Sequence, residues 1–149
     1  MKIHTEILKL KTKKELEFIK ITDKVEKILS KVKLKEGFVN IFSRHTTMAI
    51  KINEYEPQLL KDIEWFMKNL APEKRKYFHD NFKLRKNCPP NEPANADGHL
   101  RNLILETFQT IPILNYKLQL GKYQQIFIVE TSGPREREII VQVVGEKKK

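Results

Sequence analysis

The chain has 149 residues, 40% of them hydrophobic and 32% charged, and its formal net charge is +10. This size and composition indicate one globular domain and exclude a disordered chain. No apolar run approaches the roughly 20 residues that a helix needs to cross a bilayer, and a single cysteine excludes an internal disulfide framework and fits a reducing cytoplasm.

The chain begins with two strand patterns and one helix pattern. Residues 2–10 and 15–21 alternate polar and apolar side chains and are predicted to be strands. Thr22 or Asp23 can cap the helix that follows. Apolar residues recur at helical spacing in that helix, namely Val25, Ile28, Leu29 and Val32.

Two short hydrophobic strands come next, around residues 38–42 and 49–52, and a second helix begins at Pro57 and is closed by Pro72. Its buried stripe is expected to comprise Leu59, Ile63, Phe66, Met67 and Leu70. Residues 72–94 show no periodicity. A structureless stretch of this length inside a compact domain is uncommon and is usually a functional loop.

A short third helix and three strands complete the chain. The helix is expected to face inward through Leu100, Leu103, Ile104 and Phe108. The strands are predicted over residues 110–119, 122–131 and 137–144. The full order, ββαββα–long loop–αβββ, predicts an α+β fold, a single domain over residues 1–149 with about three helices on a mixed or antiparallel sheet. Residues 144–149 are expected to form a frayed basic tail.

Polar and ionisable side chains follow the two central strands directly. His45, Thr46 and Thr47 come after the first of these strands, and Asn53 and Glu54 come after the second. This pattern marks the strand ends as a candidate functional site. Glu54 is the candidate catalytic carboxylate, whereas Thr46, Thr47 and Asn53 are candidates for binding a phosphate group.

His45, His79 and His99 are candidate catalytic residues and candidate ligands of a divalent metal, zinc or magnesium. Neutral imidazole nitrogens bind divalent ions, and three of them with one open position make a hydrolytic or Lewis-acid site. The intervals between these histidines match no recognised local ligand motif. Scattered histidines in a chain of this size are ordinarily polar core or surface residues, and the sequence leaves both interpretations open.

Several features suit a phosphate ligand. Arg135 and Arg137 can point the same way, and guanidinium groups bind phosphate bidentately, although both can instead pair with neighbouring acids. Asn95 and Asp97 open the third helix, where free N–H groups suit a phosphate or a carboxylate, but either residue can simply be the N-cap. The segment KRKYFHDNFKLRK, residues 74–86, holds six basic residues and suits a phosphate or, alternatively, nucleic acid.

The strand over residues 122–131 sets a geometric limit. Gln124 and Glu130 share one face of this strand because side chains alternate along it. At about 3.3 Å per residue, roughly 20 Å separates them, so they cannot both touch one small ligand within one chain. If both are functional, they serve opposite ends of the sheet or sites shared between subunits.

Six short motifs occur in order along most of the chain: HTTMAIKINE (45–54), KDIE (61–64), YFHD (77–80), NADGHL (95–100), LQLGKYQQIFIVE (118–130) and GPRER (133–137). Together they resemble the YjbQ-like family, whose members are often described as secondary thiamine-phosphate synthases. Many relatives carry a further histidine at the position of Asp97, which makes Asp97 a weaker candidate for binding metal.

The resemblance implies an α+β fold that associates as a homotrimer, with clefts between subunits to which the strand ends deliver His45, Asn53 and Glu54. It also implies a transferase that joins a pyrimidine diphosphate to a thiazole phosphate and releases pyrophosphate. The term secondary implies a weak activity that need not be the physiological one. The expected substrate is a small phosphorylated metabolite. The alternative is a non-catalytic trimeric protein that binds a phosphorylated ligand or nucleic acid, and neither interpretation involves a membrane.

Overall fold

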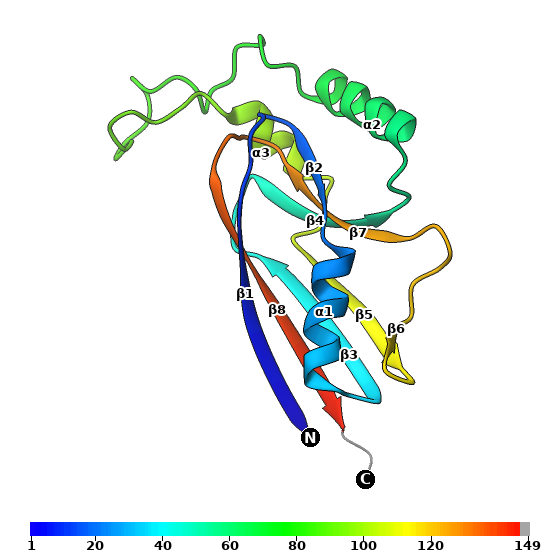
Figure 1. Cartoon of the computed structure of the whole chain (residues 1–149). Helices are drawn as coiled ribbons and strands as arrows, with labels where there is room; N and C mark the ends of the chain where they lie inside the picture. Colours follow the sequence, from blue (N-terminus) through cyan, green and yellow to red (C-terminus); the bar gives the residue numbers. More distant parts are fainter. Residues whose placement is uncertain (147–149) are drawn as a thin grey trace.

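The computed structural model describes residues 1–146, which form eight strands and three helices (Figure 1). The strands are β1 (Lys2–Lys11), β2 (Glu17–Lys20), β3 (Glu36–Ser43), β4 (Met48–Asn53), β5 (Phe108–Leu114), β6 (Lys117–Leu118), β7 (Gln125–Glu130) and β8 (Glu136–Glu146). The helices are α1 (Thr22–Val32), α2 (Pro57–Leu70) and α3 (Ala96–Asn102). Within residues 1–146, no helix is long and apolar enough to cross a membrane.

The strands form two antiparallel sheets. The large sheet has the order β1-β8-β3-β5-β6, and the small sheet has the order β2-β7-β4. Several short connections join the sheets, and two of them border the candidate site: residues 44–47 link β3 to β4, and residues 131–135 link β7 to β8. Both connections lie toward the end of the molecule that carries α3 (Figure 1). The candidate site forms at this end.

The main core lies between the large sheet on one side and α1 with the small sheet on the other. The apolar face predicted for α1 is buried, as Val25, Ile28, Leu29 and Val32 show. Residues of both sheets complete this core, among them Val39, Ile41, Ile50, Ile128 and Val141. A second, smaller core lies on the opposite face of the small sheet, where Met67 of α2 clusters with Phe127 and Val129.

The outer face of the large sheet, here called the outer sheet face, is not covered by any other part of residues 1–146. It has two apolar rows with a polar row between them. The apolar side chains are 39–57% exposed and comprise Ile3, Ile7, Phe38, Phe42 and Phe108. In the polar row, Gln142 Nε2 donates to Thr5 Oγ1 at 3.1 Å, and Thr110 Oγ1 donates to Asn40 Oδ1 at 3.0 Å. The strand register aligns these four polar residues across the sheet.

The predicted single-domain α+β class is confirmed, but the predicted order and the single sheet need correction. The strand predicted over residues 110–119 is two strands, because Asn115 and Tyr116 have left-handed φ values of 50° and 64° and form a turn. The chain therefore ends in four strands rather than three. The strands also divide into two sheets rather than one, and every strand pair is antiparallel.

The ends and faces of the first two helices also differ from the prediction. Neither Thr22 nor Asp23 caps α1 with its side chain, and Thr22 Oγ1 instead accepts from the N–H of Ile126 at 2.9 Å. α2 begins at Pro57 as predicted, but its apolar stripe is mostly not buried, because the helix packs on the small sheet through one narrow contact. Met67 is buried, Leu59 and Ile63 are half-buried, and Phe66 and Leu70 are exposed.

The prediction that the third helix faces inward through large apolar residues is wrong. Its predicted inward residues are 40–78% exposed, namely Leu100, Leu103, Ile104 and Phe108. α3 is short and packs through small and polar residues, including Ala96, Gly98 and Arg101, and Phe108 belongs to β5. The prediction of a frayed tail is also partly wrong, since residues 144–146 belong to β8, whereas residues 147–149 lie outside the described part of the chain.

Candidate functional site

A cavity of about 310 Å³ opens where residues 44–47, α3 and the β7–β8 connection meet. Its lining residues are Arg44, His45, Thr46, Thr47, Glu92, Pro93, Asn95, His99, Arg135 and Arg137, and we call it the histidine cavity. Seven of these are candidate residues from the sequence: His45, Thr46, Thr47, Asn95, His99, Arg135 and Arg137. Sequence reasoning missed Arg44, although it is adjacent to His45, and Glu92, which lies in the aperiodic loop and carries no sequence signal.

A buried ion pair fixes one wall of this cavity. Arg137 Nε donates to Glu130 Oε2 at 2.7 Å, and the exposed fractions of the two side chains are 4% and 0%. Arg137 Nη2 also donates to Thr47 Oγ1 at 2.8 Å. Glu130 accepts two further hydrogen bonds, both at 2.9 Å, from Thr12 Oγ1 and from the N–H of Ser132. Arg137 uses its donors mainly on groups of its own chain. It therefore adds structure and positive charge to the wall, and few of its donors stay free for a phosphate.

His45 is held as a neutral hydrogen-bond donor. Its Nε2 accepts from the backbone N–H of Glu138 at 3.1 Å. This bond assigns the ring proton to Nδ1, because a neutral imidazole that accepts through one nitrogen donates through the other. Burial, with a smaller contribution from the positive charge of Arg137, lowers the pKa of His45 below its ordinary value of 6.5. An N–H donor of this kind suits an anion more directly than a metal ion.

His79 and His99 form a second, closer pair of imidazoles. Their ring centroids are 4.9 Å apart, with the planes inclined at 73°. Burial and the neighbouring His79 lower the pKa of His99, so this ring is neutral at pH 7. His79 Nε2 is buried and has no hydrogen-bond partner within residues 1–146. His99 thus lines the histidine cavity on one side and contacts His79 on the other.

The start of α3 is already occupied by a carboxylate from the long loop. Asp80 Oδ1 accepts from the N–H groups of Asn95 and Ala96, at 3.0 Å and 3.1 Å. The Asn95 side chain makes no capping hydrogen bond at the start of α3. Asp80 therefore takes the position that the sequence offered to a phosphate or a carboxylate, and it ties the loop that carries His79 to the helix that carries His99.

A glycine allows α3 to lie directly against the end of β7. A Cβ at Gly98 would come within 2.5 Å of the carbonyl oxygen of Thr131. Thr131 Oγ1 donates to the carbonyls of Gly98 (2.9 Å) and Thr47 (2.7 Å). This close contact fixes where the next residue, His99, enters the cavity.

Arg135 differs from the other arginines of the cavity in its partners. Its Nε donates to the carbonyl of Ser132 at 2.8 Å, and no carboxylate in residues 1–146 forms an ion pair with it. Arg44 Nη2, by contrast, lies 2.7 Å from Glu138 Oε2. Arg135 is therefore the arginine best placed to bind an anion.

Asn53, Glu54 and Gln124 do not join the cavity within one chain. Asn53 pairs with Gln125 in the sheet register, whereas Met48, at the other end of β4, pairs with Glu130. The three side chains are exposed at the end of the small sheet away from the histidine cavity. This arrangement agrees with the separation predicted between Gln124 and Glu130.

Asp97 lies beside a different group of residues. Within the described chain, metal-type ligand atoms that gather within 4.8 Å of one another belong to Glu15, Glu73 and Asp97, and not to the three histidines. Burial and a hydrogen bond with Asp97 raise the pKa of Glu15. Asp97 thus joins an acidic cluster rather than a histidine site.

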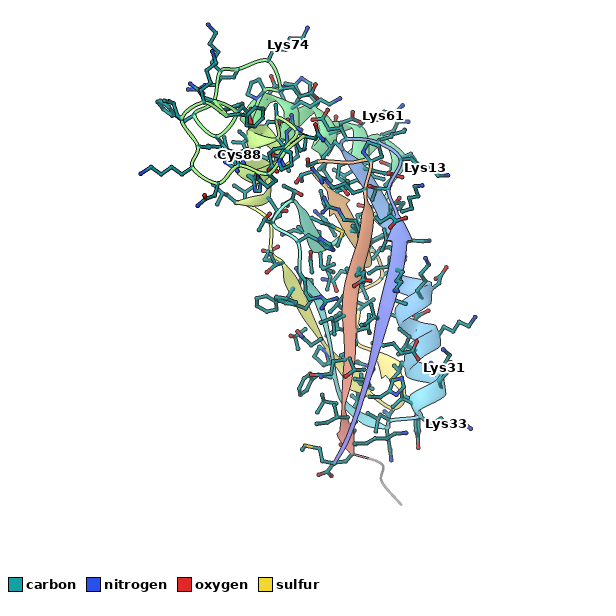
Figure 2. The ribbon with its side chains drawn as sticks, turned by 90° about the vertical axis from the view of Figure 1, so that its left-hand side faces the viewer. Lys13, Lys31, Lys33, Lys61, Lys74 and Cys88 are labelled. Atoms are coloured by element: carbon teal, nitrogen blue, oxygen red, sulfur yellow. The ribbon has the colours of Figure 1, made fainter. Side chains whose placement is uncertain are left out.

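The basic loop, residues 74–86, projects at the end of the molecule opposite Lys33, and Figure 2 shows it around Lys74. Phe78 is 93% exposed, and the Arg75 guanidinium lies 5.9 Å from the centre of the Tyr77 ring. The loop therefore presents cations and aromatic rings to solvent.

Comparison with known proteins identifies relatives along the whole chain. A family model described as "UPF0047 protein YjbQ-like" matches residues 6–146. A UPF0047 protein of Methanothermobacter thermautotrophicus is 40% identical, over 98% of this chain and 95% of its own length. A UPF0047 protein of Archaeoglobus fulgidus is 39% identical, over 92% of this chain and 98% of its own.

Solved structures show the same fold. A YbjQ-like protein of unknown function from Sulfolobus solfataricus aligns with a TM-score of 0.87 and 34% identity, covering 97% of this chain and 99% of its own. A hypothetical protein from Aeropyrum pernix aligns with a TM-score of 0.85 and 34% identity, covering 96% and 99%.

Removing Glu130 should destabilise the fold strongly. Glu130→Ala leaves Arg137 buried without its counter-charge, and we expect the free energy of unfolding to fall by about 3–5 kcal/mol. Glu138→Ala, the matched control, removes a solvent-exposed partner of Arg44 and should change the free energy of unfolding by less than about 1 kcal/mol. Urea denaturation at one fixed protein concentration measures both, and equal effects of the two substitutions would contradict this role of the buried pair.

Proposed function

The chain belongs to the UPF0047 family of YjbQ-like proteins, and on this premise we propose that it is an enzyme that binds a small phosphorylated metabolite in the histidine cavity. The observation that supports this proposal most directly is Arg135, a cavity arginine without a carboxylate partner in the described chain. Thr46 and the Nδ1–H of His45 add hydrogen-bond donors on the same cavity. A guanidinium and nearby neutral donors suit a phosphate group.

The proposed chemistry is group transfer with a phosphate or diphosphate leaving group. Arg135 and Arg44 would stabilise the negative charge that develops on the leaving oxygen. Burial lowers the pKa of His99, so its ring is neutral near pH 7 and offers one lone pair that can bind a metal ion. Thiamine-phosphate synthesis, in which a pyrimidine diphosphate and a thiazole phosphate react and release pyrophosphate, is the specific reaction that the family resemblance suggests.

A divalent metal fits the histidine pair better than it fits all three histidines. His79 Nε2 is buried without a partner in residues 1–146, and the ring of His99 is 4.9 Å from that of His79. Imidazole ligands favour zinc over magnesium, which prefers oxygen. A bound zinc ion would act as a Lewis acid on a phosphoryl oxygen. His45 would bind the substrate anion, since its Nε2 already accepts a backbone hydrogen bond.

We also propose that the chain forms a homotrimer with its sites in clefts between subunits. The outer sheet face exposes large apolar side chains, and it continues at its edge into Glu138 and Arg44 beside the histidine cavity. A neighbouring subunit on this face would lie next to the cavity. Asn53, Glu54 and Gln124, which do not reach the cavity of their own chain, would then be available to a neighbouring one.

A non-catalytic binding protein for nucleic acid is the second candidate, and the basic loop favours it. Phe78 is 93% exposed among lysines and arginines, and bases stack on such rings while cations contact the phosphates. Salt dependence separates the two functions, because nucleic-acid affinity falls steeply with ionic strength.

The first experiment measures anion binding with pyrophosphate as the probe. We expect saturable binding by isothermal titration calorimetry, and at least a tenfold loss in affinity for Arg135→Ala, since charge-assisted hydrogen bonds to phosphate contribute about 1.5–3 kcal/mol each. Arg75→Ala, in the basic loop, is the matched control and should bind normally. If Arg75→Ala lost affinity and Arg135→Ala did not, the anion site would lie in the loop. Pyrophosphate release from the pyrimidine and thiazole substrates tests the specific reaction.

The second experiment measures zinc after metal loading. His79→Ala and His99→Ala should each lose most of the bound zinc, because each removes one imidazole of the pair. His4→Ala removes a histidine of β1, far from the pair along the large sheet, and should retain the zinc content of the unaltered protein. Equal zinc content in all four proteins would refute the histidine-pair site.

The third experiment measures the molar mass in solution by light scattering. The unaltered protein should have the mass of three chains. Phe108→Glu places a charge on the outer sheet face opposite Phe42 and should yield monomers. Phe78→Glu, at the fully exposed loop, should leave the mass unchanged. A monomeric unaltered protein, or a trimeric Phe108→Glu variant, would contradict this interface.

A further inference from the structure

A separate cavity of about 360 Å³ shares His99 with the histidine cavity. Its lining residues are Tyr77, Phe78, His79, Ala96, His99 and Leu100, and we call it the apolar cavity. Among the described residues, no lysine, arginine or carboxylate lines it. A mostly apolar lining with a few polar groups is the usual composition of a small-molecule site.

Hydrogen bonds hold the two walls of the apolar cavity together. One wall is the loop around Tyr77, and the other is the start of α3. Asp80 joins them by accepting from the N–H groups of Asn95 and Ala96. The Tyr77 hydroxyl donates its proton to the carbonyl of Pro72 at 2.9 Å, so Tyr77 adds mainly its ring to the lining. The cavity is therefore formed before any ligand binds.

The lining side chains offer little to a polar ligand. The imidazoles of His79 and His99 are the only side chains of the lining that carry nitrogen, and they contact each other with ring centroids 4.9 Å apart. A sugar hydroxyl placed here would lose its hydrogen bonds to water without full replacement, whereas a hydrocarbon group has none to lose. Small-molecule sites usually have volumes of about 300–1,000 Å³, so this cavity suits a group of ring size.

We propose that the apolar cavity binds a ring-sized hydrocarbon group, and that this group belongs to the ligand whose phosphate lies in the histidine cavity. The second clause rests on the proposed function. His99 lines both cavities, so groups bound in the two cavities border the same imidazole. Asn95 and Ala96, adjacent at the start of α3, line the histidine cavity and the apolar cavity, respectively. The substrate class is therefore a phosphate ester of a hydrocarbon alcohol rather than a sugar phosphate.

Calorimetric titration of the full chain with phosphate monoesters tests this class. Benzyl phosphate should bind at least tenfold more tightly than methyl phosphate, because a tenfold gain requires burial of only about 60 Å² of apolar surface. Ribose 5-phosphate, which is similar in size to benzyl phosphate but polar, should bind more weakly than benzyl phosphate. Equal affinity for benzyl and methyl phosphate, or tighter binding of ribose 5-phosphate than of benzyl phosphate, would overturn the proposal.

Substitutions assign the preference to the apolar cavity. Leu100→Ser removes an exposed apolar side chain of the lining and should reduce the preference for benzyl over methyl phosphate to less than about threefold, with methyl phosphate bound as before. Leu103→Ser is the matched control and should keep the full preference, since Leu103 is exposed and does not line the cavity. Arg135→Ala should weaken both esters by the same factor. A full preference in Leu100→Ser would contradict the assignment.

Benzyl alcohol, which carries no phosphate, separates the apolar cavity from the proposed function. The chain has four histidines, and their imidazole signals can be followed by NMR in the metal-free protein. Benzyl alcohol should shift the signals of His79 and His99 and leave that of His4, in β1, unchanged. A protein that binds neither ester but shows these shifts would contradict the proposed function and retain the hydrocarbon site. Unshifted signals of His79 and His99 would overturn the site itself.

Discussion

The buried ion pair between Glu130 and Arg137 is the interaction on which the candidate site depends. A charge pair this deeply buried is stable only if its remaining donors and acceptors are satisfied. Here Thr12, Thr47 and Ser132 satisfy them, so the end of β1, the end of β7, the start of β8 and the loop before β4 meet at one point. These segments carry the walls of the histidine cavity, whose shape therefore follows from the pair.

A second polar cavity, of about 480 Å³, shares a wall with the histidine cavity. Arg44, Arg135, Arg137 and Glu92 are the charged residues of the histidine cavity, and Glu15, Asp97 and Arg135 are those of the second cavity. Asn95 and Arg135 belong to both linings. The start of α3, at Asn95, therefore borders both cavities.

The sequence correctly predicted the elements whose buried faces follow from local side-chain periodicity. The buried face of α1 and the strands around residues 38–42 and 49–52 follow from side-chain spacing alone. The errors arise where contacts between residues distant in sequence determine which face of an element is buried. α3 packs by means of Gly98 against Thr131, a contact between residues 33 positions apart, and its larger apolar residues consequently face outward. Most candidate residues line one cavity, but nothing in the spacing revealed that Asp80 caps α3 or that Asp97 joins Glu15 and Glu73.

The polar row across the outer sheet face constrains whatever covers that face. Thr5, Asn40, Thr110 and Gln142 already bond to one another in two pairs, yet each pair keeps unused donor and acceptor capacity. A purely apolar surface packed against the row would remove these groups from water without pairing them. A partner with polar atoms opposite the row would satisfy them. The polar row therefore fixes the register of a partner on this face, because a shifted partner would leave these groups unpaired. It also disfavours non-specific association of the exposed apolar side chains.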